Sequence, residues 1–244
     1  KFYSIDYDRF EPTIWPYLNI VYRNTNGLES YWDYTSSSAG RAGTGYVNNY
    51  TGNLVWVRND IGFGGNRMPE SISHIYNTGE ASSNIRGLGF GWRTNFHQSV
   101  GVWMNVEGTE WYYAWTDADG TMHYFYQVLV TPENQEDIQV EGLEGRDLFQ
   151  DEDGLGLTLG VAPYSAEYTT DKYIIIDKQG NKSFFDSLGR LIKMENNQQI
   201  ASSITIAYDD GNADAIERSL RISKVVDGAG REYRFSYSAD NLLT

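Results

Sequence analysis

The 244-residue sequence contains no cysteine. This absence excludes disulfide scaffolds, thiolate zinc sites and cysteine nucleophiles. Basic residues are also scarce, since 19 Lys and Arg stand against 33 Asp and Glu and give a formal net charge of −14. Binding of nucleic acid needs clustered Lys and Arg, and no such cluster is present, so no nucleic-acid partner is expected. No window approaches the roughly 18 consecutive apolar residues of a membrane helix, so no transmembrane segment is predicted.

Helix signals are few. The one candidate is Thr131-Pro132-Glu133, an N-cap residue followed by Pro at the first helical position, and at most two turns are expected there. In contrast, 19 Tyr, 10 Phe, 7 Trp and 25 Gly form a composition that favours pleated strands and tight turns. The predicted fold class is therefore all-β, with consecutive antiparallel hairpins forming an extended curved sheet. We expect at least ~40% strand and less than ~10% helix.

Alternation of apolar and polar residues predicts strands along the whole chain. Residues 1–45 form a lead-in, with a strand at 17–22, a turn at 26–27 and a Ser- and Gly-rich irregular loop at 29–45. A second segment, 46–109, and a hairpin series, 110–244, follow and are expected to form one continuous β unit. The strands predicted in these two segments are 46–50, 54–58, 71–76, 110–115, 121–130, 172–176, 182–185, 200–208, 220–226 and 231–237.

A short turn pattern recurs in the second half of the chain. An Asp is followed three positions later by Gly, and an aromatic or aliphatic strand comes next. Asp and Gly make the turn because Gly adopts positive φ without strain. One hairpin cannot bury its own apolar face, so the units must pack side by side. The copies are Asp117 to Gly120, Asp177 to Gly180, Asp186 to Arg190 and Asp227 to Arg231.

These residues resemble the YD-repeat, or Rhs, family. Tyr208-Asp209 is an instance of the dipeptide that names the repeat, and Asp-x-x-Gly-Arg is its turn signature. Further upstream, the segments 51–54, 72–77 and 87–95 follow the order of the segment that opens the repeat region in Rhs-type proteins. His74 and Ile75 stand where the family often has Arg or Thr. The resemblance covers residues 46–244, and residues 1–45 are similar to the lead-in of secreted Gram-positive members.

The resemblance implies a fold and a role. The family builds β-sheets that spiral into hollow shells, which enclose or present another segment, as in toxin complexes and teneurins. It implies a non-enzymatic structural module of a secreted or surface bacterial protein, with the remainder of its own polypeptide as partner. Any enzymatic part and the aspartyl self-cleavage site belong near the far C-terminal end, so no catalytic, cofactor-binding or metal residue is expected here. Because the sequence ends at 241–244 in a strand-like pattern, we expect a piece of a longer protein.

Three histidines and two acidic pairs are the candidate chemical sites. His74, His97 and His123 show no metal-ligand spacing and are expected to be ordinary packed or surface residues. Asp117/Asp119 and Asp151/Asp153 are each followed by Gly, but the EF-hand register places Trp or Phe at the first ligand position. Turn chemistry is the better account, and an irregular calcium loop is the alternative.

The second functional reading rests on aromatic residues. Trp111, Tyr113 and Trp115 alternate and must share one face of a strand. Exposed, such a row would hold sugar rings, which makes a carbohydrate-binding module at the cell envelope the alternative function; directed inward, it would be core. A hydrolase comes third and needs two facing carboxylates in a cleft. Trp92, in the Gly-rich bend, is expected to be buried, and 231–237 is expected at an open sheet edge that could recruit another chain.

Overall fold

The computed structural model describes residues 26–62, 64–65, 67–68, 71–82, 84, 86–104, 111–128, 140–163, 171–209, 220–238, 240 and 242–244. Strands make up 49% and helices 3% of this part of the chain, which confirms the all-β prediction. The helical residues form two short 3-10 turns, η2 (Gly40–Ala42) and η3 (Thr78–Glu80). No helix in these ranges is long and apolar enough to cross a membrane. The strand predicted at 17–22 and the helix candidate at 131–133 lie outside the described residues.

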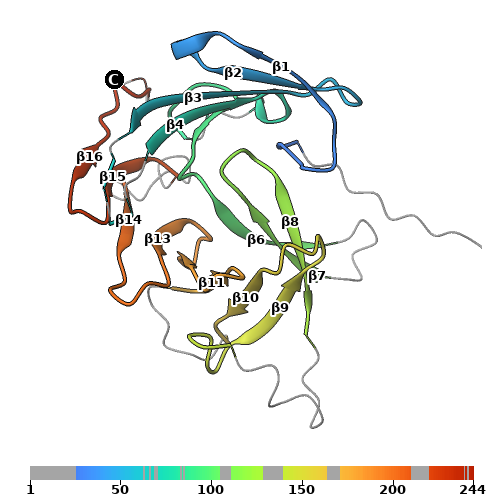
Figure 1. The fold of residues 1–244 in the computed structure, drawn as a ribbon, viewed down its shortest axis with the longest axis vertical. Coiled ribbons are helices and arrows are strands. Elements are labelled where there is room, and N and C mark those ends of the chain that lie inside the picture. The colour runs from blue at the N-terminus through green and yellow to red at the C-terminus, as the bar shows by residue number, and fades with distance from the viewer. Residues whose placement is uncertain are drawn as a thin grey trace, which may run out of the picture.

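Two antiparallel sheets of consecutive hairpins form the fold (Figure 1). In both sheets every strand lies beside its neighbour in sequence, so the predicted series of hairpins is confirmed. The first sheet contains β1 (Tyr34–Ser38), β2 (Thr44–Asn48), β3 (Leu54–Gly62), β4 (Ser71–Asn77) and β5 (Trp92–Thr94). The second sheet contains β6 (Ser99–Met104), β7 (Trp111–Thr116), β8 (Met122–Gln127), β9 (Asp147–Asp151), β10 (Thr158–Val161), β11 (Tyr173–Ile176), β12 (Lys182–Phe185), β13 (Leu191–Glu195), β14 (Ser203–Tyr208), β15 (Ile222–Val226) and β16 (Glu232–Arg234).

The prediction of an irregular loop over residues 29–45 is wrong. β1 lies within it and pairs with β2 along its whole length, from Tyr34 opposite Asn48 to Ser38 opposite Thr44. The side chains of β1 after Tyr34 are exposed, so this edge strand carries no apolar alternation that a sequence could reveal. Five short strands were also missed, namely β5, β6, β9, β10 and β13.

The Asp-x-x-Gly pattern forms the same turn four times. In each copy the Asp carboxylate accepts hydrogen bonds from the backbone N–H groups two and four residues later. The Gly N–H returns to the Asp carbonyl oxygen, and the Asp N–H bonds to the carbonyl four residues on. Each Gly has positive φ, between 78° and 97°. This is a hairpin connection that ends in a left-handed residue, which the Asp side chain stabilises. The predicted turn chemistry at these positions is confirmed.

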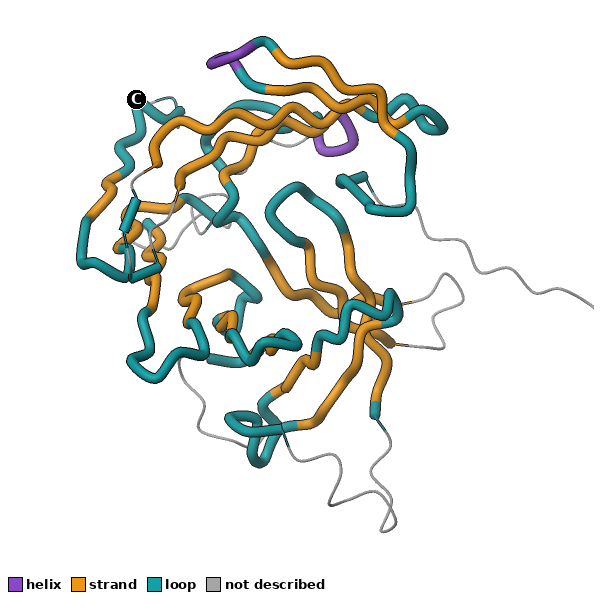
Figure 2. Tube along the Cα trace, viewed as in Figure 1, coloured by secondary structure: helices purple, strands orange, loops and turns teal. Residues whose placement is uncertain are grey.

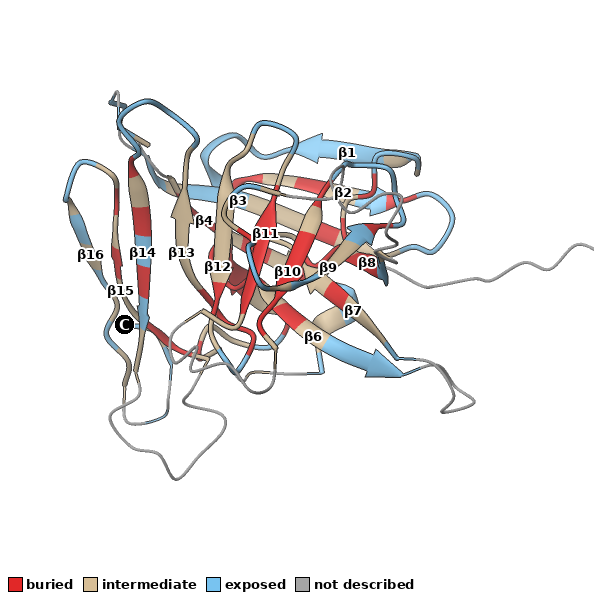
Figure 3. Cartoon of the chain, turned by 90° about the horizontal axis from the view of Figure 1, so that it is seen from below, coloured by how far each residue is buried: buried red, intermediate tan, exposed pale blue. Residues whose placement is uncertain are grey.

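The main core is formed mostly by the second sheet, whose strands carry stripes of buried residues (Figure 3). Ile72 of the first sheet packs in the same cluster as residues of the second sheet. The fully buried members Phe125, Leu159 and Phe185 come from strands spread across the second sheet. Because residues of both sheets share one core, neither sheet buries its apolar face alone.

The second sheet curves back toward its own first strand. The N–H of Val100 in β6 donates to the carbonyl of Gly189 at 2.8 Å, and Ser99 forms an isolated bridge with Arg190. Gly189 belongs to the turn between β12 and β13, and a Cβ there would lie 2.0 Å from the Val100 oxygen. The bend is visible in the tube view, where the orange strands wind around the centre (Figure 2). The second sheet is therefore curved enough for its first strand, β6, to contact the turn between β12 and β13.

The last strand of the second sheet is an edge. β16 pairs with β15 alone among the described strands, with Tyr233 opposite Val225. The predicted edge at 231–237 is confirmed over Glu232–Arg234, whereas the end of that range is paired within the chain. Beyond β16 the chain turns, and Tyr237 forms an isolated antiparallel bridge with Leu243.

The first prediction concerns the Asp turns. The carboxylate of Asp227, in a residue only 2% exposed, accepts from the N–H groups of Ala229 and Arg231 and from Nε of Arg231 at 2.6 Å. Asp227→Asn should destabilise the protein by about 2–3 kcal/mol because it weakens a buried charge-assisted bond. Asp177→Asn, at a turn where the carboxylate meets only uncharged donors, should cost less than about 1 kcal/mol. Urea unfolding measures both.

The stabilisation that Asp227 provides should also depend on pH. Burial would raise the pKa of Asp227, but its bonds to Arg231 and Ala229 outweigh burial and lower it. A carboxylate with a lowered folded pKa stabilises the protein above its unfolded pKa, and the contribution is lost as the pH falls through the folded pKa. The difference between wild type and Asp227→Asn should therefore shrink below about pH 4. A difference that stays constant down to pH 2 would contradict the charge-assisted account.

Candidate functional site

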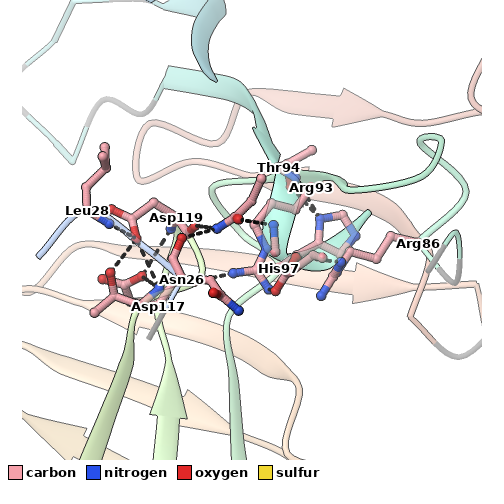
Figure 4. Close-up of polar contacts among 12 residues, drawn as sticks. Asn26, Leu28, Arg86, Arg93, Thr94, His97, Asp117 and Asp119 are labelled. Carbon is pink, nitrogen blue, oxygen red and sulfur yellow. Dashed lines mark hydrogen bonds and ion pairs between the residues drawn. The ribbon is translucent and has the colours of Figure 1, made fainter. Parts of the chain in front are cut away.

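The most unusual polar site is a buried cluster between the two sheets. We define the Arg93 cluster as Asn77, Glu80, Arg86, Arg93, Asp117 and Asp119 (Figure 4). Asn77 is fully buried and Arg93 is 1% exposed. A buried guanidinium is costly unless it is paired and hydrogen-bonded. The contacts of this cluster therefore decide what it does.

The Gly-rich bend before β5 positions Arg93. Gly91 has φ of 74°, and a Cβ there would lie 2.9 Å from the carbonyl oxygen of Asn77, whose own N–H donates to the Gly91 carbonyl. β5 then pairs with β4, with Arg93 opposite Ile75. The bend therefore requires glycine, as the sequence predicts.

The expectation that Trp92 is the buried residue of this bend is wrong. Trp92 is half-buried and packs against the ring of Tyr76, with centroids 5.3 Å apart. Successive residues of a strand point to opposite faces, so the next residue, Arg93, takes the inward position. The aromatic residue covers the outside of the bend while the cation fills the interior.

Arg93 joins the two sheets. Its Nη1 donates to the carbonyl oxygen of Asp117 in the β7–β8 turn at 2.9 Å, and its Nη2 lies 3.2 Å from Oε1 of Glu80. The other oxygen of Glu80 binds Arg86 at 3.1 Å. Burial, together with the charge of Arg86, lowers the pKa of Arg93 to about 10, and Glu80, Asp117 and Asp119 oppose this shift. Arg93 therefore remains charged at neutral pH.

Asn77 connects residues 26–28 to the β7–β8 turn beside Arg93. Its Nδ2 donates to the carbonyl oxygens of Asn26 at 2.6 Å and Asp119 at 3.1 Å. The N–H of Leu28 donates to Oδ1 of Asp119 at 3.2 Å. Residues 26–28, β4 and the β7–β8 turn thus meet at one point.

Gly120 makes this contact possible. It has φ of 97°, and a Cβ would lie 3.0 Å from Nδ2 of Asn77 and 3.2 Å from Nη1 of Arg93. The glycine of the repeated turn therefore has a second use in this copy, because it lets two buried side chains approach the backbone.

Asp117 and Asp119 are the paired carboxylates of the cluster. Burial, and then the charge of Asp117, raises the pKa of Asp119 to about 6. Oδ1 of Asp119 already accepts from the N–H of Leu28 and from the N–H and Oγ1 of Thr121. These bonds hold a turn and a chain segment in place. The pair therefore has a structural use that needs no substrate.

Asp151 and Asp153, the second acidic pair, make different kinds of contact. Asp151 accepts from the N–H groups of Leu155 and Leu157, each at 2.6 Å, so its predicted turn chemistry is confirmed. Asp153 instead lies 3.0 Å from Nδ1 of His123, whose Nε2 lies 3.4 Å from Asp117. Among the described residues, no three His, Asp or Glu side chains are grouped so that they could hold a metal ion.

The three histidines occupy different environments. Burial would lower the pKa of His123, but the hydrogen bonds and charges of Asp117 and Asp153 outweigh it and raise the pKa to about 9. Burial, with Arg86 and Arg93 nearby, holds the pKa of His97 well below its usual value. The neutral His97 ring accepts from the N–H of Thr94 at Nδ1, so its Nε2 carries the proton that it donates to the Leu220 carbonyl at 3.1 Å. His74 pairs with Asp60, which also binds Nε of Arg58.

The three aromatic residues that alternate along β7 differ in exposure. Trp111 is 69% exposed, whereas Tyr113 and Trp115 are half-buried and pack against the main core. Beside Trp111 lies Met104 of β6, and the preceding residue, Trp103, is 48% exposed. The core reading applies to two members of the row, and exposed aromatic surface remains at the end of the β6–β7 hairpin.

Taken together, the Arg93 cluster is arranged to fasten chain segments to one another. Sequence reasoning missed Arg93, Glu80 and Asn77 as a unit, because 40 residues separate Asn77 from Asp117 in the chain and only the fold brings them together. One signal was available: an Arg directly after a Gly-rich bend and a Trp, in a chain with few basic residues.

Comparison with known proteins places the cluster in a matched region. Residues 44–125 match a family described as a domain of unknown function (DUF6531). No curated protein matches the chain. The matched span runs from the start of β2 into β8 and contains every member of the Arg93 cluster.

The second prediction tests Arg93. Arg93→Met removes one partner of a buried ion pair and leaves Oε1 of Glu80 and the Asp117 carbonyl without their donor, while Oε2 of Glu80 keeps Arg86, so it should cost about 3–5 kcal/mol in urea unfolding. Arg234→Met, at a side chain 77% exposed, is the matched control and should change stability by less than about 0.5 kcal/mol. Equal effects of the two substitutions would refute a structural role for the cluster.

The third prediction concerns His123. Its folded pKa of about 9 lies above its unfolded value, so its stabilising contribution is complete below about pH 6.5 and is lost as the pH rises through 9. His123→Gln should remove on the order of 1–2 kcal/mol of pH dependence between pH 6 and 9, less than the full shift because solvent screens the partly exposed Asp117 and Asp153. Unfolding midpoints at pH 6, 7.5 and 9 measure this effect. A pH dependence of stability that is the same in His123→Gln as in the wild type would contradict the assignment.

Proposed function

We propose that this chain is a non-enzymatic structural module of a secreted or surface bacterial YD-repeat (Rhs-type) protein, and that it opens a β-shell that encloses or presents another segment. The observation that carries the proposal is the Asp-x-x-Gly turn. Four copies share one hydrogen-bond pattern, and three of them lie in the second sheet after β10, where strands follow one another in sequence order. A repeated hairpin with an invariant turn extends a sheet by simple addition, as a shell requires.

The first sheet fits the role of a starting cap. It is joined to the β7–β8 turn through the Arg93 cluster, so the repeated hairpins begin from a fixed point. The region that matches DUF6531 covers this junction and ends at Phe125, before most of the repeated turns. A cap followed by repeats is the order in which an opening segment is expected to occur. The proposed partner is the remainder of the same polypeptide, and a toxin-associated segment is the expected content of the shell.

The fourth prediction tests this role in the longest natural polypeptide that carries the module. If the module opens a shell, a downstream segment inside the shell should resist digestion by proteinase K in the wild type. Arg93→Met should expose that segment and speed its cleavage at least tenfold, while Arg41→Met, at an exposed side chain of η2, should leave protection unchanged. A downstream segment that is digested equally fast in all three proteins would refute the shell function.

A carbohydrate-binding module is the second candidate, favoured by one observation. Trp103 and Trp111 expose ring surface on opposite faces of one hairpin, since Trp103 lies opposite Tyr112 and Trp111 opposite Met104. An exposed ring on either face can stack on a sugar ring. Trp103→Ala with Trp111→Ala should abolish co-sedimentation with insoluble bacterial cell wall if this candidate is right. Tyr50→Ala, at a residue 77% exposed in the turn between β2 and β3, is the control. A wild-type chain that stays in the supernatant would exclude this candidate.

A further inference from the structure

The chain beyond β16 has already begun another antiparallel pairing. The N–H of Ser238 donates to the Leu242 carbonyl at 2.7 Å, and the N–H of Thr244 donates to the Ser236 carbonyl at 2.9 Å. These bonds flank the bridge between Tyr237 and Leu243. The N–H of Leu243 also donates to the Gly87 carbonyl at 2.8 Å, which holds this returning segment against the Gly-rich bend.

The register of this pairing assigns a place to each residue that would follow Thr244. With Tyr237 opposite Leu243, the next four residues would lie opposite Phe235, Arg234, Tyr233 and Glu232 in turn. The N–H of Phe235 points to β15, where it bonds to Ser223. The N–H and C=O groups of Glu232 and Arg234 therefore point to the open side, because backbone groups alternate along a strand. A strand in this register would satisfy them.

A groove lies beside the open edge. Its volume is about 380 Å³, and β3, β4, β16 and residues 243–244 line it. Its apolar wall includes Ile61, Ile72, Phe235 and Leu243, and Ile72 belongs to the main core. Tyr233 and Phe235 also pack against that core, so odd-numbered positions of β16 face inward. Residues that would lie opposite Tyr233 and Phe235 must face the groove as well.

The position of the added strand that lies opposite Arg234 faces outward and meets charged side chains. Arg234 is exposed on the groove's rim and pairs with Glu232 at 2.8 Å, and Lys224, opposite Arg234 on β15, lies 3.5 Å from the same carboxylate. Arg58, also on the rim, and His74 bind Asp60, the one acidic residue of the lining. The three cationic side chains of Arg58, Lys224 and Arg234 thus outnumber the two carboxylates. A residue opposite Arg234 therefore meets net positive charge. A carboxylate is the side chain that this position favours.

We propose that the groove and the outer edge of β16 bind an extended strand that directly follows Thr244 in the same polypeptide, with apolar side chains at its first and third positions and a carboxylate at its second. The proposal rests on the proposed function, since it requires that the module be part of a longer repeat protein. It adds the register and the side-chain chemistry of the next strand. A one-residue shift would reverse which side chains enter the groove.

Two extended chains of equal composition provide the test. One adds Val-Glu-Ile-Thr after Thr244, and the other adds Glu-Val-Thr-Ile, which places the polar residues in the groove. The first should raise the melting temperature by about 3–6 °C, on the scale expected for a protein of this size, and the second by less than about 1 °C. Hydrogen exchange of the Glu232 and Arg234 amides should slow at least tenfold in the first chain only. Arg234→Glu in the first chain should remove at least half of the gain in melting temperature.

The alternatives give different results. Equal effects of the two extensions, or none, would overturn the proposed strand chemistry. The proposal would also fail if the unextended chain dimerises through β16 and neither extension dissociates the dimer, because the edge would then belong to a second copy. The shell function is tested separately by protection of the downstream segment. Protection without a register effect would refute this inference alone, and a register effect without protection would refute the shell function alone.

Discussion

The guanidinium of Arg93 lies buried where the first sheet meets the β7–β8 turn of the second. Placing a cation there is unfavourable unless it is paired and hydrogen-bonded. Glu80 supplies the opposite charge and the Asp117 carbonyl accepts from Nη1, whereas Nε is buried without a hydrogen-bond partner among the described residues. The close packing around Arg93 also requires two glycines. Gly91 lets β5 approach Asn77, and Gly120 leaves room for the Arg93 side chain. A single buried charge thus determines how the lead-in, the first sheet and the first hairpin of the second sheet meet.

The second organising element is the Asp turn, which works locally. Each copy closes within five residues and satisfies its own backbone donors, so the direction and register of the hairpin are set by local contacts. In the copies at Asp186 and Asp227 the fifth residue is Arg, and its Nε returns to the same carboxylate. Arg190 also stacks over the ring of Tyr208, so the turn of one hairpin is attached to the strand of another. The sheet therefore grows through a local rule, and the Arg93 cluster supplies its fixed origin.

The sequence predicts what depends on local chemistry and fails where a contact depends on the fold. The hairpins around the Asp turns could be predicted because turn and strand signals lie side by side in the chain. β1 could not, because Ser36 and Ser37 form an exposed edge strand without apolar alternation. The bend at Gly91 could be predicted from its glycines, but which side chain it buries depends on strand parity, and this placed Arg93 inside instead of Trp92. The partners of Arg93 come from η3 and the β7–β8 turn, and no spacing in the sequence indicates that these segments meet.

The contact between β6 and the β12–β13 turn has a consequence for folding kinetics. Nearly every strand pair joins neighbours in sequence, so most contacts can form early, as soon as two adjacent segments are free to meet. The bridge from Ser99 to Arg190 and the bond from His97 to the Leu220 carbonyl instead join segments that are far apart in the sequence. The bond from His97 spans 123 residues. During synthesis from the N-terminus, β6 leaves the ribosome long before either partner exists. The first sheet must therefore hold His97 in place for its late partner, and the curvature of the second sheet becomes permanent only when the distant turn arrives.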